Sequence, residues 1–164
     1  MENEVQNSAA YWIHRLNMTP HPEGGYFKEV YRSAMQVKKE GTDVERSAMT
    51  SIYYLLENES FSAFHRIKSP ESWYFHQGAP LLIYSFEGGK LVCRELSDEE
   101  DGSLQITMEP DIWFAARLKT PHTFCLVSCA VAPGFEYEEF ELIDRATLLS
   151  EYPDSEKEII ELTR

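Results

Sequence analysis

The chain has 164 residues, of which 43% are hydrophobic and 13% aromatic. These values predict one folded domain over residues 1–164 and argue against global disorder. The formal net charge of −13, from 28 acidic and 15 basic residues, argues against nucleic acid or an anionic membrane surface as a partner, because both bind through basic patches. We expect an acidic, well-solvated surface.

The three cysteines, Cys93, Cys125 and Cys129, form neither a disulfide framework nor a metal-binding CxxC pair. Cys125 and Cys129 are expected on one strand, about 13 Å apart and beyond disulfide reach. The cysteines predict buried thiols in a reducing compartment. Because the sequence shows no signal peptide and no stretch long enough to span a bilayer, we expect a cytoplasmic protein.

The first expected element is a short amphipathic helix over residues 5–17, which Thr19-Pro20 stops. The run His21-Pro22-Glu23-Gly24-Gly25 predicts a rigid loop followed by a flexible turn. Residues 26–32 then alternate as a strand. Residues 34–47 are polar and predict an exposed loop.

Nine strand-like runs follow at short intervals, each rich in β-branched or aromatic residues. Glu87-Gly88-Gly89-Lys90 predicts a tight hairpin turn, because glycine adopts positive φ without strain. Two helical pieces are expected near the end, at 144–151 and 154–162. The pattern is typical of an all-β sandwich or small barrel with short terminal helices. The nine runs are 49–56, 61–67, 71–76, 80–86, 90–96, 104–108, 112–118, 123–131 and 136–142.

The stretch 64–78 combines more groups able to bind or transfer a proton than any other part of the chain. Its spacing is His65-x-Ile67-x3-Glu71-x6-Gly78. This resembles the first motif of the cupins, which in metal-binding members runs His-x-His, then Glu, then Gly. The run 110–115 stands where the second cupin motif, Pro-x-Gly-x-x-His, would fall.

Together with 21–27 and 131–135, these motifs resemble one group of the cupin superfamily, catalogued as domain of unknown function 985. The resemblance covers roughly residues 10–153. It implies a double-stranded β-helix, or jelly-roll barrel, commonly a homodimer, with a small-molecule pocket inside the barrel. It does not bring a defined reaction with it.

The resemblance is incomplete at the metal ligands. Metal-binding cupins hold their ion with three His and one Glu, whereas here Ile67 and Ala115 stand at two of the His positions. His76 lies five residues after Glu71, and odd separations on a regular strand point to opposite faces. We therefore expect no obligatory metal cofactor. A divalent metal held by His65, Glu71 and His76 is kept as an alternative.

Deoxysugar-nucleotide epimerases of the same superfamily use a pocket His as base without a metal, and His65 is similarly placed. A neutral imidazole suits proton abstraction next to a carbonyl. Glu71 could orient His65, or act as a second acid or base if burial raises its pKa. His65 and Glu71 are therefore the candidate catalytic residues. The candidate ligand-binding residues are Trp73, Phe75, Tyr84, Trp113, Glu23 and Arg32.

The predicted function is to bind, and to isomerise or epimerise, a small polar carbonyl or sugar-like molecule. A nucleotide-sugar epimerase also needs cations for the diphosphate, and Arg66, Arg32 and Lys68 are the nearby choices. Arg66 should point out of the barrel if His65 points in. Two alternatives stay open: a metal-dependent oxygenase or isomerase, and a non-catalytic binding or sensing module.

Overall fold

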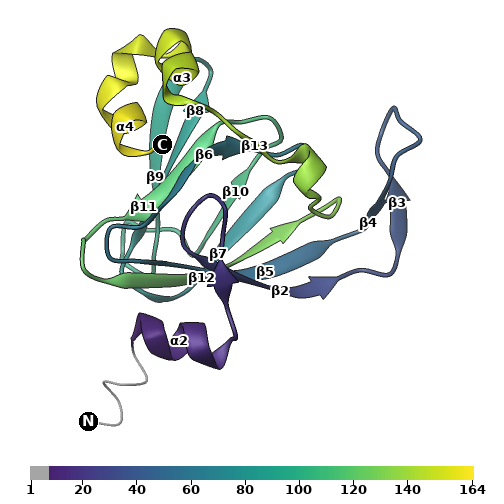
Figure 1. Ribbon diagram of the computed structural model, residues 1–164, viewed down its shortest axis with the longest axis horizontal. Helices are drawn as coiled ribbons and strands as arrows, with labels where there is room; N and C mark the ends of the chain where they lie inside the picture. Colours follow the sequence, from purple (N-terminus) through teal and green to yellow (C-terminus); the bar gives the residue numbers. More distant parts are fainter. Residues whose placement is uncertain (1–7) are drawn as a thin grey trace.

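Two antiparallel sheets face each other in the computed structural model, which describes residues 8–164 (Figure 1). The all-β architecture predicted from the strand pattern is confirmed. One sheet has the order β1 (Thr19–Pro20), β2 (Tyr26–Arg32), β5 (Thr50–Glu57), β12 (Phe124–Val131), β7 (Glu71–Gly78) and β10 (Gln105–Met108). The other has the order β13 (Glu141–Leu142), β6 (Phe61–Arg66), β11 (Phe114–Leu118), β8 (Leu81–Glu87) and β9 (Lys90–Leu96).

The main core lies between the two sheets and follows from alternation along each strand. On β11, Phe114, Ala116 and Leu118 face this core, because residues two apart lie on one face of a strand. Ala115 of the same strand belongs to a second cluster. The second cluster packs under the helices near the end of the chain, with Leu148 fully buried. The five-stranded sheet is therefore buried on both faces.

Short helices cover the outer surfaces of both sheets (Figure 1). Helix α2 (Ala9–Arg15) begins after Ser8, whose hydroxyl accepts a hydrogen bond from the Tyr11 amide; residues 5–7 of the predicted helix lie outside the described residues. Asp144 caps α3 in the same way, through the Thr147 amide. The remaining helical segments are α3 (Arg145–Glu151), α4 (Glu156–Glu161) and the 3₁₀ turns η1 (Tyr137–Glu139) and η2 (Pro153–Ser155). No helix of the described residues is long and apolar enough to cross a membrane.

The structure departs from the predicted elements at two places. The polar segment 34–47 contains a β-hairpin of β3 (Gln36–Lys38) and β4 (Glu45–Ser47), which stands off the body (Figure 1). Its pairing rests on backbone hydrogen bonds, so a hydrophobic pattern does not reveal it. The run 136–142 is mostly not a strand: a 3₁₀ turn occupies 137–139 and only two residues pair with β6.

Two local predictions have opposite outcomes. The hairpin turn between β8 and β9 is confirmed, with Gly88 and Gly89 at φ of 58° and 81°. The prediction of three buried thiols is wrong for Cys93, which is exposed on β9, whereas Cys125 and Cys129 are buried on β12. Cys93 lies on edge strand β9, which pairs only with β8 among the described strands.

Candidate functional site

A cavity of about 80 Å³ lies between the two sheets, next to the segment that joins β12 to β13. Its wall comes from the loop 21–23, from strands β2, β5, β6, β7 and β12, and from residues 135–140. Both His65 and Glu71 line it, as do Trp73 and Arg32. The volume suits a molecule of a few heavy atoms and is large enough to hold ordered water.

His65 lies on β6 with its side chain turned into the barrel, 2% exposed. Its Nδ1 lies 2.7 Å from the carbonyl oxygen of Ala63. The ring also lies against Phe114 and Phe140, with centroid distances of 4.3 and 5.4 Å. Because a carbonyl oxygen only accepts, we assign a hydrogen to Nδ1, which leaves Nε2 of the neutral ring as an acceptor.

Glu23 is the carboxyl group that meets this Nε2. Its Oε2 lies 3.1 Å from His65 Nε2, and Glu23 is only 5% exposed. The Glu23 carbonyl oxygen accepts hydrogen bonds from the Ala63 amide at 3.0 Å and from Arg164 Nη1 at 2.9 Å. Ala63 therefore positions both residues of the contact. Its amide binds the Glu23 backbone, and its carbonyl oxygen binds the His65 ring.

The two glycines that follow Glu23 allow this close approach. Gly24 has φ of 113°, and a Cβ placed there would lie 2.0 Å from the Phe61 carbonyl oxygen. Gly24 also offers its carbonyl oxygen to the Tyr54 hydroxyl at 2.6 Å. The loop therefore lies directly against β5 and β6. This close approach places the Glu23 side chain in the cavity wall.

Glu23 Oε2 and His65 Nε2 lie 3.1 Å apart, a distance over which one proton can pass between the oxygen and the nitrogen. Since Nδ1 donates to Ala63, that proton comes from the carboxyl group or from an imidazolium. Burial raises the pKa of Glu23 and lowers the pKa of His65. Both directions favour the neutral pair, a carboxylic acid that donates to an imidazole.

Glu71 is a second buried carboxyl group of the cavity, at the first residue of β7 and 8% exposed. Burial, which disfavours the charged carboxylate, raises the pKa of Glu71 to about 7. The short contact of His65 Nε2 is to Glu23. The carboxyl group beside this nitrogen therefore comes from the 21–25 loop and not from β7.

The raised pKa of Glu71 predicts a pH-dependent stability. Between pH 4.5 and about 7 the folded protein keeps a proton on Glu71 that the unfolded chain has released, so the free energy of unfolding falls as pH rises through this range. We expect the Glu71→Gln variant to gain about 3 kcal/mol over the wild type between pH 4.5 and 8. Urea denaturation at several pH values measures the gain. An equal offset at all pH values would contradict the prediction.

Several residues predicted for the pocket wall lie elsewhere. Tyr84 and Trp113 belong to the outer cluster under α3 and α4, where Arg117 and Arg66 contact them. They were misplaced because the five-stranded sheet is buried on both faces, so burial alone does not tell inside from outside. Phe75 faces the main core, packed against it but away from the cavity wall.

The residues present do not complete the His and Glu ligand set of a metal-binding cupin. His76 is exposed on the outer face of β7 and bonds Ser128 Oγ at 2.7 Å, as its odd separation from Glu71 predicts. Ile67 lines the cavity in place of a ligand, and Ala115 faces the outer cluster. Within residues 8–164, no three His, Cys, Asp or Glu side chains are arranged to hold a metal ion.

The site residues predicted from the sequence did not include His21 or the aromatic side chains within 135–140, which line the cavity. His21 lines the cavity, with its ring against Phe27 and Tyr54 at 4.7 and 5.8 Å. Its Nδ1 accepts a hydrogen bond from the Glu23 amide at 3.1 Å. The proximity of His21 to Glu23 in the sequence was the available signal, whereas residues 135–140 have no periodicity that assigns them to a wall.

Comparisons with known proteins agree with this architecture. Residues 10–143 match the family model described as Cupin superfamily (DUF985). A hypothetical protein from Leishmania major has a TM-score of 0.88 and 34% identity, over 96% of this chain and 99% of that one. Protein SO0799 from Shewanella oneidensis has a TM-score of 0.87 and 31% identity, over 96% and 98% of the two chains.

A curated relative is also similar in sequence. The uncharacterized protein YML079W of Saccharomyces cerevisiae is 28% identical over 151 residues, which is 83% of this chain and 75% of that protein. The family match covers well over half of the chain, and the similar structures share the two-sheet barrel. The chain therefore belongs to the Cupin superfamily (DUF985), and its barrel is the jelly roll of that superfamily.

Proposed function

We propose that this cupin binds a small, uncharged, polar carbonyl compound in the barrel cavity and moves a proton between a carbon and an oxygen of that compound, without an obligatory metal. The observation that carries the proposal is the 3.1 Å contact between Glu23 Oε2 and His65 Nε2 inside the cavity. A buried acid and a buried base in direct contact are suited to general acid–base chemistry.

The proton transfers balance with these two groups alone. The Glu23 carboxylic acid gives its proton to the ligand carbonyl oxygen, and His65 Nε2 takes a proton from the neighbouring carbon. The electron pair of the broken C–H bond forms the carbon–carbon double bond of an enol, and the carbonyl π pair binds the proton from Glu23. In an α-hydroxy carbonyl compound this enol is an enediol. Transfer of the proton from His65 to the former carbonyl carbon, with loss of the α-hydroxyl proton to Glu23, completes an isomerisation. Return of a proton to the opposite face of the original carbon, with the enol hydroxyl proton going back to Glu23, completes an epimerisation.

The charges of the cavity wall support an uncharged ligand. Arg32 is the only Lys or Arg among the described residues that line the cavity, and two carboxylates already hold it, Glu29 at 2.9 Å and Glu136 at 2.8 Å. Arg66 and Lys68 pair with acidic residues outside the cavity. A diphosphate would therefore lack free cationic partners, so the analogy with nucleotide-sugar epimerases does not extend to the ligand.

Solvent-deuterium exchange tests the proposal. In deuterium oxide, we expect the wild type to exchange carbon-bound hydrogen of a small compound such as dihydroxyacetone or glyceraldehyde. NMR measures the rate of this exchange. The His65→Gln variant should lose about 10²-fold or more of the rate. Ligand binding with no exchange in any compound would contradict the proton transfer and favour a binding module.

A second arm of the experiment separates the metal-dependent alternative. Protein dialysed against EDTA should keep its exchange activity. Loss of exchange after dialysis and its recovery with Fe²⁺ or Mn²⁺ would overturn the metal-free proposal. The homodimer and the cytoplasmic location stay predictions from the sequence.

A further inference from the structure

The segment 132–140, between β12 and β13, covers the cavity. Phe135, Glu136, Tyr137 and Phe140 of this segment line the cavity wall. The Phe140 ring lies 5.4 Å from the His65 ring and 6.1 Å from the His21 ring, measured between centroids. A ligand that reaches His65 from this side must therefore displace side chains of the segment.

Among the described residues, hydrogen bonds from the backbone of this segment reach the barrel only near the two ends of the segment. At its start, the Gly134 amide donates to the Ser47 carbonyl at 2.7 Å, and the Phe135 amide donates to Thr50 Oγ1 at 2.9 Å. At its end, Glu141 pairs with β6. In between, the amides of residues 139 and 140 donate within the 3₁₀ turn itself.

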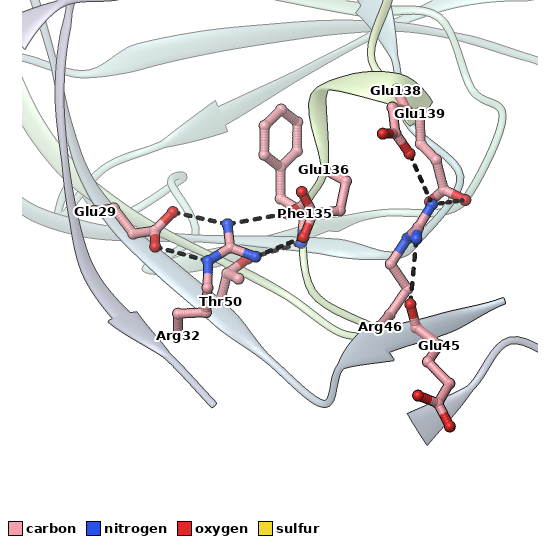
Figure 2. Close-up of polar contacts among 9 residues, drawn as sticks. All are labelled: Glu29, Arg32, Glu45, Arg46, Thr50, Phe135, Glu136, Glu138 and Glu139. Carbon is pink, nitrogen blue, oxygen red and sulfur yellow. Dashed lines mark hydrogen bonds and ion pairs between the residues drawn. The ribbon is translucent and has the colours of Figure 1, made fainter. Parts of the chain in front are cut away.

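Ion pairs hold this middle part from two sides, and Figure 2 shows both. On one side, Arg32 Nη1 donates to Glu136 Oε1 at 2.8 Å, while Nε and Nη2 donate to Glu29 at 2.9 Å each. Nη2 also donates to the Phe135 carbonyl oxygen at 3.2 Å, where the segment begins. On the other side, Glu139 accepts from Lys39 Nζ at 2.7 Å and lies 3.3 Å from Arg46 Nη2. Lys39 and Arg46 belong to the β3–β4 hairpin, which stands off the body (Figure 1).

The two sides differ in burial. The side chains of Arg32 and Glu136 are 36% and 41% exposed, whereas those of Arg46 and Glu139 are 12% and 15% exposed. Solvent-exposed ion pairs contribute little to stability and weaken with salt. The contact that gives way most readily is therefore the one between Arg32 and Glu136. Arg32 keeps its two hydrogen bonds to Glu29 when Glu136 moves away. Opening therefore does not leave the Arg32 charge without an acidic partner.

We propose that residues 136–140 form a lid over the cavity, that the Arg32–Glu136 ion pair is its latch, and that the β3–β4 hairpin carries the lid through Glu139. The ligand enters when the latch opens. The role in ligand entry rests on the function proposed for the cavity, but opening of the lid is testable without any ligand or turnover.

Two native cysteines provide the test. Cys129 lines the cavity, whereas Cys125 is buried four residues earlier on the same strand, away from the cavity wall. Methyl methanethiosulfonate should label Cys129 through lid opening but Cys125 only through wider unfolding, and peptide mass spectrometry separates the two sites. We expect Glu136→Gln to speed labelling of Cys129 by about two- to five-fold with no change at Cys125. Added NaCl should speed the wild type toward the variant.

Glu138→Gln is the matched control, because Glu138 lies on the same turn, is 84% exposed and is 3.7 Å from Arg46. It should leave both labelling rates unchanged. Equal rates for Cys129 in the wild type and in Glu136→Gln would overturn the latch. Parallel changes at Cys125 and Cys129 would show unfolding rather than a lid. Neither result depends on proton transfer, so the lid and the proposed function can fail separately.

Discussion

The Glu23→Gln variant is expected to keep the fold and the ligand cavity while losing about 10²- to 10⁴-fold of the solvent-exchange rate. A glutamine amide has the same shape as the protonated carboxyl and can donate to His65 Nε2 in its place. It cannot give up that proton to a carbonyl oxygen. Deuterium incorporation measured by NMR, together with the urea midpoint, separates chemistry from stability.

Two control variants test whether the loss of exchange in Glu23→Gln comes from the Glu23 carboxyl group itself. Glu141→Gln makes the same change in a residue that pairs with Arg66 outside the cavity, and it should leave the exchange rate unchanged. Glu23→Asp keeps the carboxyl group but shortens the side chain by one methylene, which weakens the contact with His65. Full exchange activity in Glu23→Gln would contradict the role of Glu23 as the acid. Glu71, the other buried carboxyl group of the cavity, would then be the candidate acid.

The Gly24→Ala variant is expected to lose about 3 kcal/mol or more of the free energy of unfolding. Two causes add together: a φ of 113° strains any residue with a Cβ, and this Cβ would lie 2.0 Å from the Phe61 carbonyl oxygen. The loop can relieve the clash only by moving away from β6, which withdraws Glu23 from His65. Chemical denaturation measures the loss.

Gly41→Ala is a control for a positive φ without a clash. Gly41 has φ of 73°, but nothing lies within 4 Å of a Cβ placed there. We expect this variant to lose only about 1 to 2 kcal/mol. Equal losses in the two variants would show that the close approach of the 21–25 loop to β6 contributes nothing beyond strain.

The sequence by itself determined the features that repeat along a strand. The positions of most strands, the inward direction of His65, Glu71 and Trp73, and the outward direction of His76 all follow from alternation. This period is a local property of extended backbone, so it can be read without knowledge of the partner strands. The motif spacing around His65 indicated the family on the same local basis.

Only the tertiary structure decided which groups meet in the cavity. Glu23 reaches His65 because two glycines bring a loop against another strand. Residues 135–140 line the site from a turn that has no periodicity. Trp113 lies on the outer face because helices cover the second side of its sheet. Contacts of this kind join segments far apart in the chain, and their geometry depends on loop closure and layer packing, which local pattern does not encode.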